Sequence, residues 1–235
     1  MMEPGDAHLE PFERLDRFAA LVGTDRADEV PLDRAALAMA AVLRAQPTDD
    51  ALAVLDELAA GCPEPTFEGV RAHLFDALGF RGDTSDYDHP RNSFLDVVLE
   101  RRRGLPILLA TVMIEVARRV GVAVVGVGMP MHFLVRDARD EGAYVDPFTG
   151  EALDRAGVRR TFETLSAGRL PWDDAHLAPT PARLVVLRML TNLRASYARR
   201  RDPIGLALVA KMRAAIPELG PAAAIEAARL GGVLN

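Results

Sequence analysis

The feature that most constrains this chain is an apolar segment at residues 105–121. Its apolar side chains recur at helical spacing and form a wide stripe: Leu105, Leu108, Leu109, Val112, Met113, Val116, Ala117 and Val120. Pro106 suits the first turn of a helix, because its missing N–H would have no partner there. Gly121 comes just after a last turn that contains Arg118 and Arg119, and it suits the helix end. We therefore expect a buried helix over this segment.

Three strand candidates follow that helix, at residues 122–127, 132–136 and 143–146. The turn-forming residues between them, at 128–130 and 138–142, suit an antiparallel meander. A long buried helix followed by antiparallel strands is typical of an α+β core. The fold class that we expect is therefore α+β.

The region before the buried helix predicts several shorter helices. Residues 32–44 and 49–60 carry apolar side chains at three- and four-residue spacing, and Thr48 is a plausible N-cap of the second helix. A third helix is expected over 67–78. The polar, turn-rich residues 81–90 indicate a loop.

A capping-box-like pattern opens the next predicted helix. Ser93 is expected as its N-cap, with Asp96 reaching back, and the helix should run to about Arg102 before Gly104 breaks it. After the strands, residues 153–180 indicate short helices and loops. Amphipathic helices are then expected after Thr180-Pro181 and Asp202-Pro203, with a third over 221–230.

Composition narrows the class of protein. The 235 residues carry a formal net charge of −6 and are 49% hydrophobic and 26% charged, as in an ordinary globular protein. An acidic chain lacks the overall basic balance of a general nucleic-acid binder, so we expect no nucleic-acid partner. The arginine triplets at 101–103 and 199–201 are interpreted as solvated helix ends. Lys211 is the sole lysine, and this arginine bias suggests a GC-rich bacterial genome.

The single cysteine, Cys62, excludes an intramolecular disulfide and a multi-cysteine metal site. The first fifteen residues show neither the basic region nor the apolar core of a signal peptide. An apolar run of membrane-spanning length is also missing from the sequence. We therefore expect a cytoplasmic protein without a membrane contact.

His132 and Asp146 are the candidate catalytic residues. In a Cys-His-Asp triad the histidine takes a proton from the thiol and the carboxylate fixes the imidazole tautomer. The thiol is best placed at a helix N-terminus, where the dipole stabilises thiolate. The chain offers a helix start at Gly104-Leu105-Pro106, followed by strands that carry His132 and Asp146.

Three ordered blocks resemble the transglutaminase-like family of bacterial SirB-one-type proteins. The blocks are NSFLDVVLERRRGLPILL (92–109), VGVGMPMHFLVR (125–136) and VDPF (145–148). The resemblance implies a transglutaminase-like, cysteine-protease-like core with a buried central helix and antiparallel strands. It also implies that His132 and Asp146 match the family's histidine and aspartate. The family's nucleophilic cysteine then falls at Pro106.

The end of the chain is similar to the family's tetratricopeptide-like tail. The matching residues are Asn192-Leu193, Tyr197, Asp202-Pro203, Ala207-Leu208 and Pro217. One helix pair cannot bury its own faces, so we expect it to pack on the core or on a partner. The domains implied are an N-terminal helical region (1–80), a transglutaminase-like core (81–178) and a helical tail (179–235).

Each candidate residue also has an ordinary structural interpretation. His132 can be a buried histidine that needs a partner for its N–H, and Asp146 can be a turn former before Pro147. Cys62 is in a helix-ending Gly-Cys-Pro and is expected to be structural. Thr111 and Ser93 are poor substitute nucleophiles. A metal site that combines His89 with His132 and Asp146 lacks ligand spacing, so we expect no metal and no cofactor.

Two functions remain open at this point. Because proline has no thiol, hydroxyl or titratable proton, acyl transfer from Pro106 is excluded, which favours a non-catalytic protein that binds a protein or peptide. The alternative is a hydrolase or acyltransferase that uses His132 and Asp146 with Cys62 or an activated water. Arg101–Arg103 precede this region closely enough to suggest binding of an anionic group. The sequence does not fix the oligomeric state.

Overall fold

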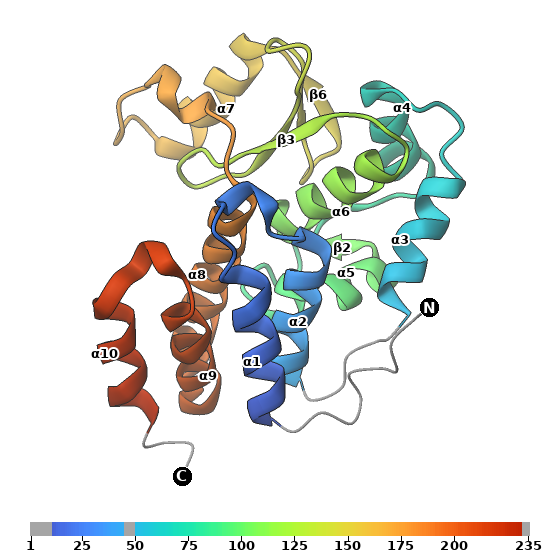
Figure 1. The fold of residues 1–235 in the computed structure, drawn as a ribbon. Helices are drawn as coiled ribbons and strands as arrows, with labels where there is room; N and C mark the ends of the chain where they lie inside the picture. The colour runs from blue at the N-terminus through green and yellow to red at the C-terminus, as the bar shows by residue number, and fades with distance from the viewer. Residues whose placement is uncertain (1–10, 45–49, 232–235) are drawn as a thin grey trace. The chain divides into compact units, whose positions relative to one another are not determined.

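The computed structural model describes residues 11–44 and 50–231 (Figure 1). These residues form two compact units, each assembled from separated parts of the chain. The first, called here the helical unit, lies within residues 1–52, 88–97 and 181–235, and the second, the sheet unit, comprises 53–87 and 98–180. The three consecutive regions expected from the sequence remain a prediction. The mixed helical and antiparallel-sheet fold confirms the α+β class.

The helical unit begins with α1 (Pro11–Val22) and α2 (Leu32–Arg44), which pack against each other. The bounds of α2 are those predicted from its apolar spacing. Phe18 in α1 and Met39 in α2 are fully buried. The C-terminal helices of the chain pack against α1 and α2.

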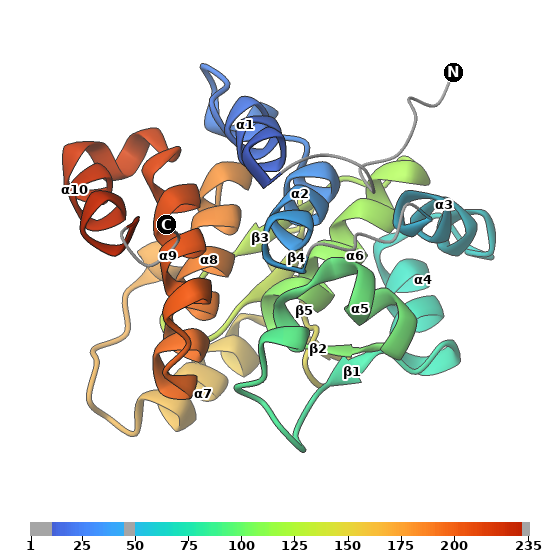
Figure 2. The ribbon, with the colours of Figure 1, turned by 90° about the horizontal axis from the view of Figure 1, so that it is seen from below.

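The C-terminal part of the helical unit consists of α8 (Ala182–Arg200), α9 (Pro203–Ala214) and α10 (Gly220–Gly231). α9 lies beside α8 and α10 (Figures 1 and 2). Asp202 caps α9, because its Oδ1 accepts the Gly205 N–H at 2.9 Å. Both α8 and α9 contact α2, so the tail packs on the N-terminal helices, whereas the sequence predicted packing on the core or on a partner.

The sheet unit contains most of α3 (Ala51–Ala60) and all of α4 (Phe67–Arg71). The N-cap predicted at Thr48 lies outside the described residues. Thr66 caps α4 by accepting the Gly69 N–H at 3.0 Å. After Arg71 the chain continues as a π-helical segment over Ala72–Ala77, so the helix predicted for 67–78 is present with a change in its hydrogen bonding.

The capping box predicted before α5 (Leu95–Arg101) is wrong in register. The helix begins at Leu95, so Phe94 precedes it, and Ser93 belongs to the 3-10 turn Pro90–Ser93. Asp96 instead forms an ion pair with Arg44 of α2, inside the helical unit. A long-range partner therefore takes the carboxylate that the local pattern assigned to a cap.

Helix α6 (Pro106–Arg119) is the central helix of the sheet unit and confirms the predicted buried segment. Pro106 is its first residue, and Gly121 follows its end with a φ of 76°, a left-handed conformation that glycine adopts readily. The helix packs against β3 and β4 of the sheet and against α4. These contacts explain why its apolar stripe is so wide.

The antiparallel sheet has the order β3-β4-β5-β6. Its strands are β3 (Val124–Val127), β4 (Leu134–Asp137), β5 (Tyr144–Asp146) and β6 (Glu151–Leu153). The first three confirm the predicted meander. β6 was missed because it is short and mostly exposed, and it pairs with β5 through Asp146↔Glu151.

Helix α7 (Arg155–Ser166) follows β6 and is longer than the short helices expected here. Asp154 caps it by accepting the Gly157 N–H at 2.6 Å. Val158 and Phe162 of α7 join Leu134 and Tyr144 of the sheet in one apolar cluster, with Trp172 packed against it. The sheet is therefore held by α7 as well as by α6.

A second, two-stranded sheet was not anticipated. β1 (Arg81–Gly82) and β2 (Arg103–Gly104) pair in parallel, with Arg81 opposite Arg103 (Figure 2). The sequence had indicated a loop at the first position and a helix end at the second. Pairing between segments so short leaves no periodic pattern in the sequence.

Within the described ranges, none of the helices combines the length and the apolar character needed to cross a membrane. The cytoplasmic location remains a prediction.

Candidate functional site

His132 lies in the turn that connects β3 with β4, two residues before β4 begins. The predicted strand began at His132, so the prediction is wrong by two residues. Its backbone N–H donates to the carbonyl oxygen of Met129 at 3.2 Å, which closes the turn. Met131 has a φ of 64°, a left-handed conformation that is uncommon for a residue with a side chain. The backbone next to His132 is thus under local strain.

Asp146 is the last residue of β5 and is buried. Its Oδ1 accepts the Phe148 N–H at 2.9 Å, and its backbone oxygen accepts the Gly150 N–H at 2.7 Å. These two bonds hold the turn that leads into β6. The ordinary interpretation of Asp146 as a turn former before Pro147 is therefore a real part of its role.

The fold brings His132 and Asp146 together. Nε2 of the imidazole lies 2.9 Å from Oδ1 of the carboxylate, and both side chains are 9% exposed. The Nε2–H is not aligned with the oxygen as in a straight hydrogen bond, so the contact is a close charge pairing when the imidazole is protonated. Two residues fourteen positions apart thus form one buried pair.

The pair has a defined chemical capacity. An ionised carboxylate only accepts hydrogen bonds, so a carboxylate at this distance favours an imidazole with its proton on the facing nitrogen. Such an imidazole can take a proton from a neighbouring hydroxyl, thiol or water. A covalent reaction additionally needs a nucleophile.

Pro106 occupies the first position of α6 and is buried. The preceding residue, Leu105, provides the backbone oxygen that accepts the N–H groups of Leu108 and Leu109, at 3.0 and 3.1 Å. The start of this central helix is therefore built from an apolar N-cap and an imino acid. It presents no reactive side chain to any substrate.

The two hydroxyls considered from the sequence, those of Thr111 and Ser93, are both buried. Thr111 is fully buried, and its Oγ1 donates to the carbonyl oxygen of Ile107 at 2.8 Å, as a residue inside a helix commonly does. Ser93 is buried in the 3-10 turn of the helical unit. These placements agree with the prediction that neither is a good substitute nucleophile.

Cys62 lies just beyond the C-terminal end of α3, and its side chain is partly buried. The thiol donates to the carbonyl oxygen of Glu64 at 3.3 Å. A helix C-terminus carries partial negative charge and opposes the thiolate that a cysteine nucleophile requires. The local geometry is that of a structural cysteine.

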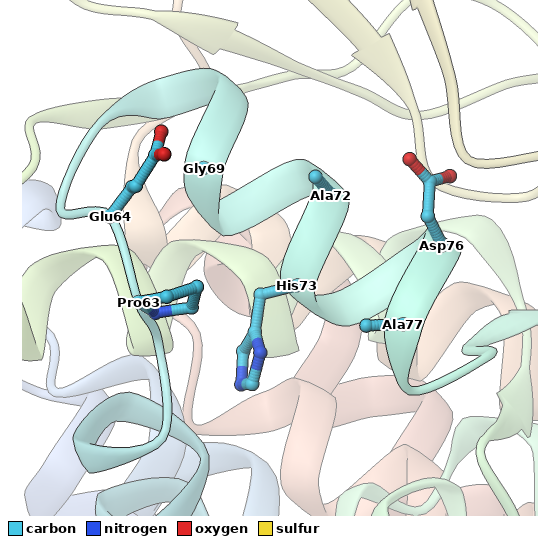
Figure 3. Close-up of a pocket in the computed structure, with 7 residues that line it drawn as sticks. All are labelled: Pro63, Glu64, Gly69, Ala72, His73, Asp76 and Ala77. Carbon is cyan, nitrogen blue, oxygen red and sulfur yellow. The ribbon is translucent and has the colours of Figure 1, made fainter.

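A hollow of about 480 Å³ lies next to this segment in the sheet unit. Figure 3 shows the imidazole of His73 beside Pro63, with the carboxylates of Glu64 and Asp76 at the two ends of the hollow. His73 Nε2 is 3.0 Å from the Leu58 carbonyl oxygen. The lining carries no hydroxyl or thiol, so this hollow offers no second site for acyl transfer.

Among residues 11–44 and 50–231, no group of three or more His, Cys, Asp or Glu side chains is placed to hold a metal ion.

Sequence reasoning missed the environment of the first arginine triplet. Arg101 forms a 2.7 Å ion pair with buried Asp83, and Arg103 donates to the Gly79 carbonyl oxygen at 2.9 Å. Only Arg102 is exposed, so the interpretation of the whole triplet as a solvated helix end is wrong. The dipeptide Arg-Gly occurs at both 81–82 and 103–104, but this repetition does not by itself predict that the two segments pair.

Comparison with known proteins places this geometry in context. A family model described as the Transglutaminase-like superfamily matches residues 15–191. A UPF0162 protein of Xylella fastidiosa is 45% identical over 135 residues, which cover 55% of this chain and 48% of that protein. The chain therefore spans about half the length of this relative.

More distant matches extend to other organisms. A UPF0162 protein of Pseudomonas aeruginosa is 32% identical over 148 residues, covering 63% of this chain and 53% of that protein. F-box only protein 21 of Mus musculus is 39% identical over 91 residues, covering 38% of this chain and 14% of that protein. No solved structure matches the chain.

Proposed function

Because the chain belongs to the transglutaminase-like superfamily, we propose that it is a non-catalytic member that binds a protein or peptide partner. The observation that carries the proposal is the start of α6, where buried Pro106 stands at the helix position that the family's nucleophile would occupy. His132 and Asp146 are still paired at 2.9 Å. A base without a nucleophile can position a ligand, and it cannot form an acyl-enzyme.

The proposal includes the finer family assignment, a SirB-one-type protein with a tetratricopeptide-like tail. The helices α8, α9 and α10 support it by packing side by side in the order that a helical repeat would give. Their outer surface carries Ile204 and Ile225, which are 57% and 54% exposed. These two exposed side chains are the positions at which the proposal places contact with a polypeptide.

The Cys62-dependent hydrolase is the weaker alternative. The Cys62 thiol is bonded to Glu64 at a helix C-terminus, which opposes thiolate formation. The water-dependent form of the alternative rests on His132 and Asp146 alone, and it predicts activity that disappears with His132.

The assignment of Pro106 to the nucleophile's position can be tested by restoring a thiol. In a Cys62→Ser background, Pro106→Cys should create a thiol that iodoacetamide alkylates about tenfold faster with His132 present than in a His132→Ala partner. The measurement is the alkylation rate by mass spectrometry at neutral pH. A rate that does not depend on His132 would show that position 106 is not the nucleophile's place.

Binding is tested separately with the full-length chain. Capture of proteins from a cell extract of the source bacterium should be weakened by Ile204→Asp and Ile225→Asp, because a charge would be placed in an apolar contact. Leu170→Asp is the matched control, since Leu170 is 44% exposed in the sheet unit. Equal capture by all variants would remove the tail from the proposal. Deletion of the tail is a poor test, because α8 and α9 pack on α2.

A further inference from the structure

A second hollow of the sheet unit has an unusual concentration of cations. Its volume is about 550 Å³. Its lining, called here the arginine pocket, consists of Arg81, Gly82, Asp83, Thr84, Ser85, Arg101, Arg103, Phe148 and Thr149. Three guanidinium groups and one carboxylate give it a formal charge of two positive units. Neither His132 nor Asp146 belongs to this lining.

Backbone pairing forces two of these cations together. Arg81 and Arg103 are opposite each other in the parallel β1–β2 pair. Like charges at such positions are normally destabilising. The pKa of Arg103 is lowered, first by burial and then by the charges of Arg81 and Arg101. The fold therefore maintains a local repulsion that an anion would relieve.

The carboxylate of Asp83 balances only part of this charge. Its Oδ2 pairs with Arg101 Nη2 at 2.7 Å, and its Oδ1 accepts the Ser85 hydroxyl at 2.6 Å. These contacts hold the pKa of Asp83 well below its usual range, so it stays ionised and committed to this cluster. Arg81 and Arg103 remain without a carboxylate partner among the described residues.

The guanidinium of Arg103 is held in place with donors to spare. Its Nη1 donates to the carbonyl oxygens of Gly79 and Arg102, both at 2.9 Å. The other N–H groups of this side chain have no acceptor among the residues that the structure describes. Arg81 is exposed at the mouth of the pocket and has no hydrogen-bonded acceptor for its guanidinium in the same residues. The held guanidinium of Arg103 and the exposed guanidinium of Arg81 together offer donors that suit the binding of an anion.

The opposite wall is built by the turn after Asp146. Gly82 donates its N–H to the Phe148 carbonyl oxygen at 2.8 Å, and a Cβ at Gly82 would lie 2.1 Å from the Phe148 ring. Glycine is therefore required for this close approach. Thr149 Oγ1 accepts the Glu151 N–H at 3.2 Å, so its hydroxyl hydrogen can be donated to a ligand.

We propose that the arginine pocket binds a phosphate group, either as free inorganic phosphate or as a phosphate carried by a peptide. A phosphate dianion matches the formal charge of the lining, and its oxygens match the forked donors of Arg81 and Arg103. A single carboxylate would leave one positive charge unbalanced. This inference does not depend on the proposed function of the tail or of the His132–Asp146 pair.

The test uses the full-length protein and calorimetric titration with inorganic phosphate at constant ionic strength, with sodium chloride as the blank. Arg81→Gln and Arg103→Gln should each weaken phosphate binding about tenfold or more, because each removes charge-assisted hydrogen bonds. The matched control is Arg102→Gln, which removes the same charge from the same triplet outside the pocket, and it should change the affinity less than about twofold.

A tripeptide Ala-phosphoserine-Ala distinguishes the two sources of phosphate. Tighter binding of the tripeptide than of phosphate identifies a carried phosphate, and equal or weaker binding identifies the free ion.

A second measurement separates a binding role from a structural one. Without phosphate, Arg81→Gln should raise the thermal midpoint of the protein, because the repulsion between Arg81 and Arg103 is removed. A purely structural Arg81 would lower it. The proposal is overturned if the wild-type chain shows no saturable phosphate binding, or if Arg102→Gln weakens binding as much as the pocket variants do.

Discussion

The start of α6 and the His132–Asp146 pair differ in the side chains that they present. The helix start has a buried proline behind an apolar N-cap, so it contributes only packing and a fixed backbone. The pair keeps a buried imidazole 2.9 Å from a carboxylate. The pair also has a structural role, since Asp146 holds the turn into β6. The two regions show that a buried histidine–carboxylate pair can contribute to stability whether or not a nucleophile lies nearby.

Asp146→Ala should give the largest effect. The substitution removes the acceptor of the Phe148 N–H and leaves the buried imidazole without its facing carboxylate. We expect the free energy of unfolding to fall by about 2–4 kcal/mol, measured by urea denaturation.

The matched control for that prediction is Asp137→Ala. Asp137 makes the same local bond, with Oδ1 accepting the Arg139 N–H at 2.8 Å, but the bond is exposed. Its loss should cost about 1 kcal/mol or less. Equal losses at the two positions would show that burial and His132 add nothing to Asp146.

His132→Ala should have the next largest effect. Loss of the imidazole leaves the Asp146 carboxylate buried without its cationic or N–H-bearing neighbour, at a cost of about 1–3 kcal/mol. His132→Asn should recover part of this loss, because its amide can donate to the carboxylate. A His132→Ala variant as stable as the wild type would contradict the structural role of the pair.

Met131→Gly should have a smaller effect with the opposite sign. Met131 is 45% exposed and has a φ of 64°, so glycine relieves backbone strain at little loss of packing. The strain relief and the greater freedom of glycine in the unfolded chain oppose each other, and we expect a net gain of about 0.5 kcal/mol. A loss of stability in thermal unfolding would show that the left-handed turn is held by the Met131 side chain.

Pro106→Ala tests the start of α6 and should have a similarly small effect, in the destabilising direction. Proline at the first helical position lowers the entropy of the unfolded chain, so its replacement should cost about 0.4–1 kcal/mol. Pro203→Ala is the control, because Pro203 has the same position in α9 and is exposed. A loss at Pro106 much larger than at Pro203 would indicate that packing of the buried ring, and not the helix start alone, explains the proline.

The parts of the fold that the sequence predicted are those with a long regular pattern. Helices α2 and α6 each carry an apolar stripe over several turns. Strands β3, β4 and β5 are separated by segments of recognisable turn-forming residues. The capping interpretation of Asp96 failed because its partner, Arg44, is distant in sequence. Local patterns contain no information about such a partner.

The candidate site was predicted in part for the same reason. The contact between His132 and Asp146 follows from a short meander whose turns can be recognised in the sequence. The arginine pocket depends on the β1–β2 pair, which joins two dipeptides that are far apart in sequence. Their repeated Arg-Gly pattern indicates a similarity, but only the fold shows that Arg81 and Arg103 become neighbours.

The measurement that tests the central claim most directly is the rate at which the intact chain hydrolyses an activated ester, p-nitrophenyl acetate, compared with His132→Ala at neutral pH. The account predicts equal and low rates, because the start of α6 provides no nucleophile for the imidazole to activate. Circular dichroism at the same temperature establishes that the variant is folded. A rate that falls at least tenfold in folded His132→Ala would contradict the account, and it would identify a hydrolase that works through the His132–Asp146 pair.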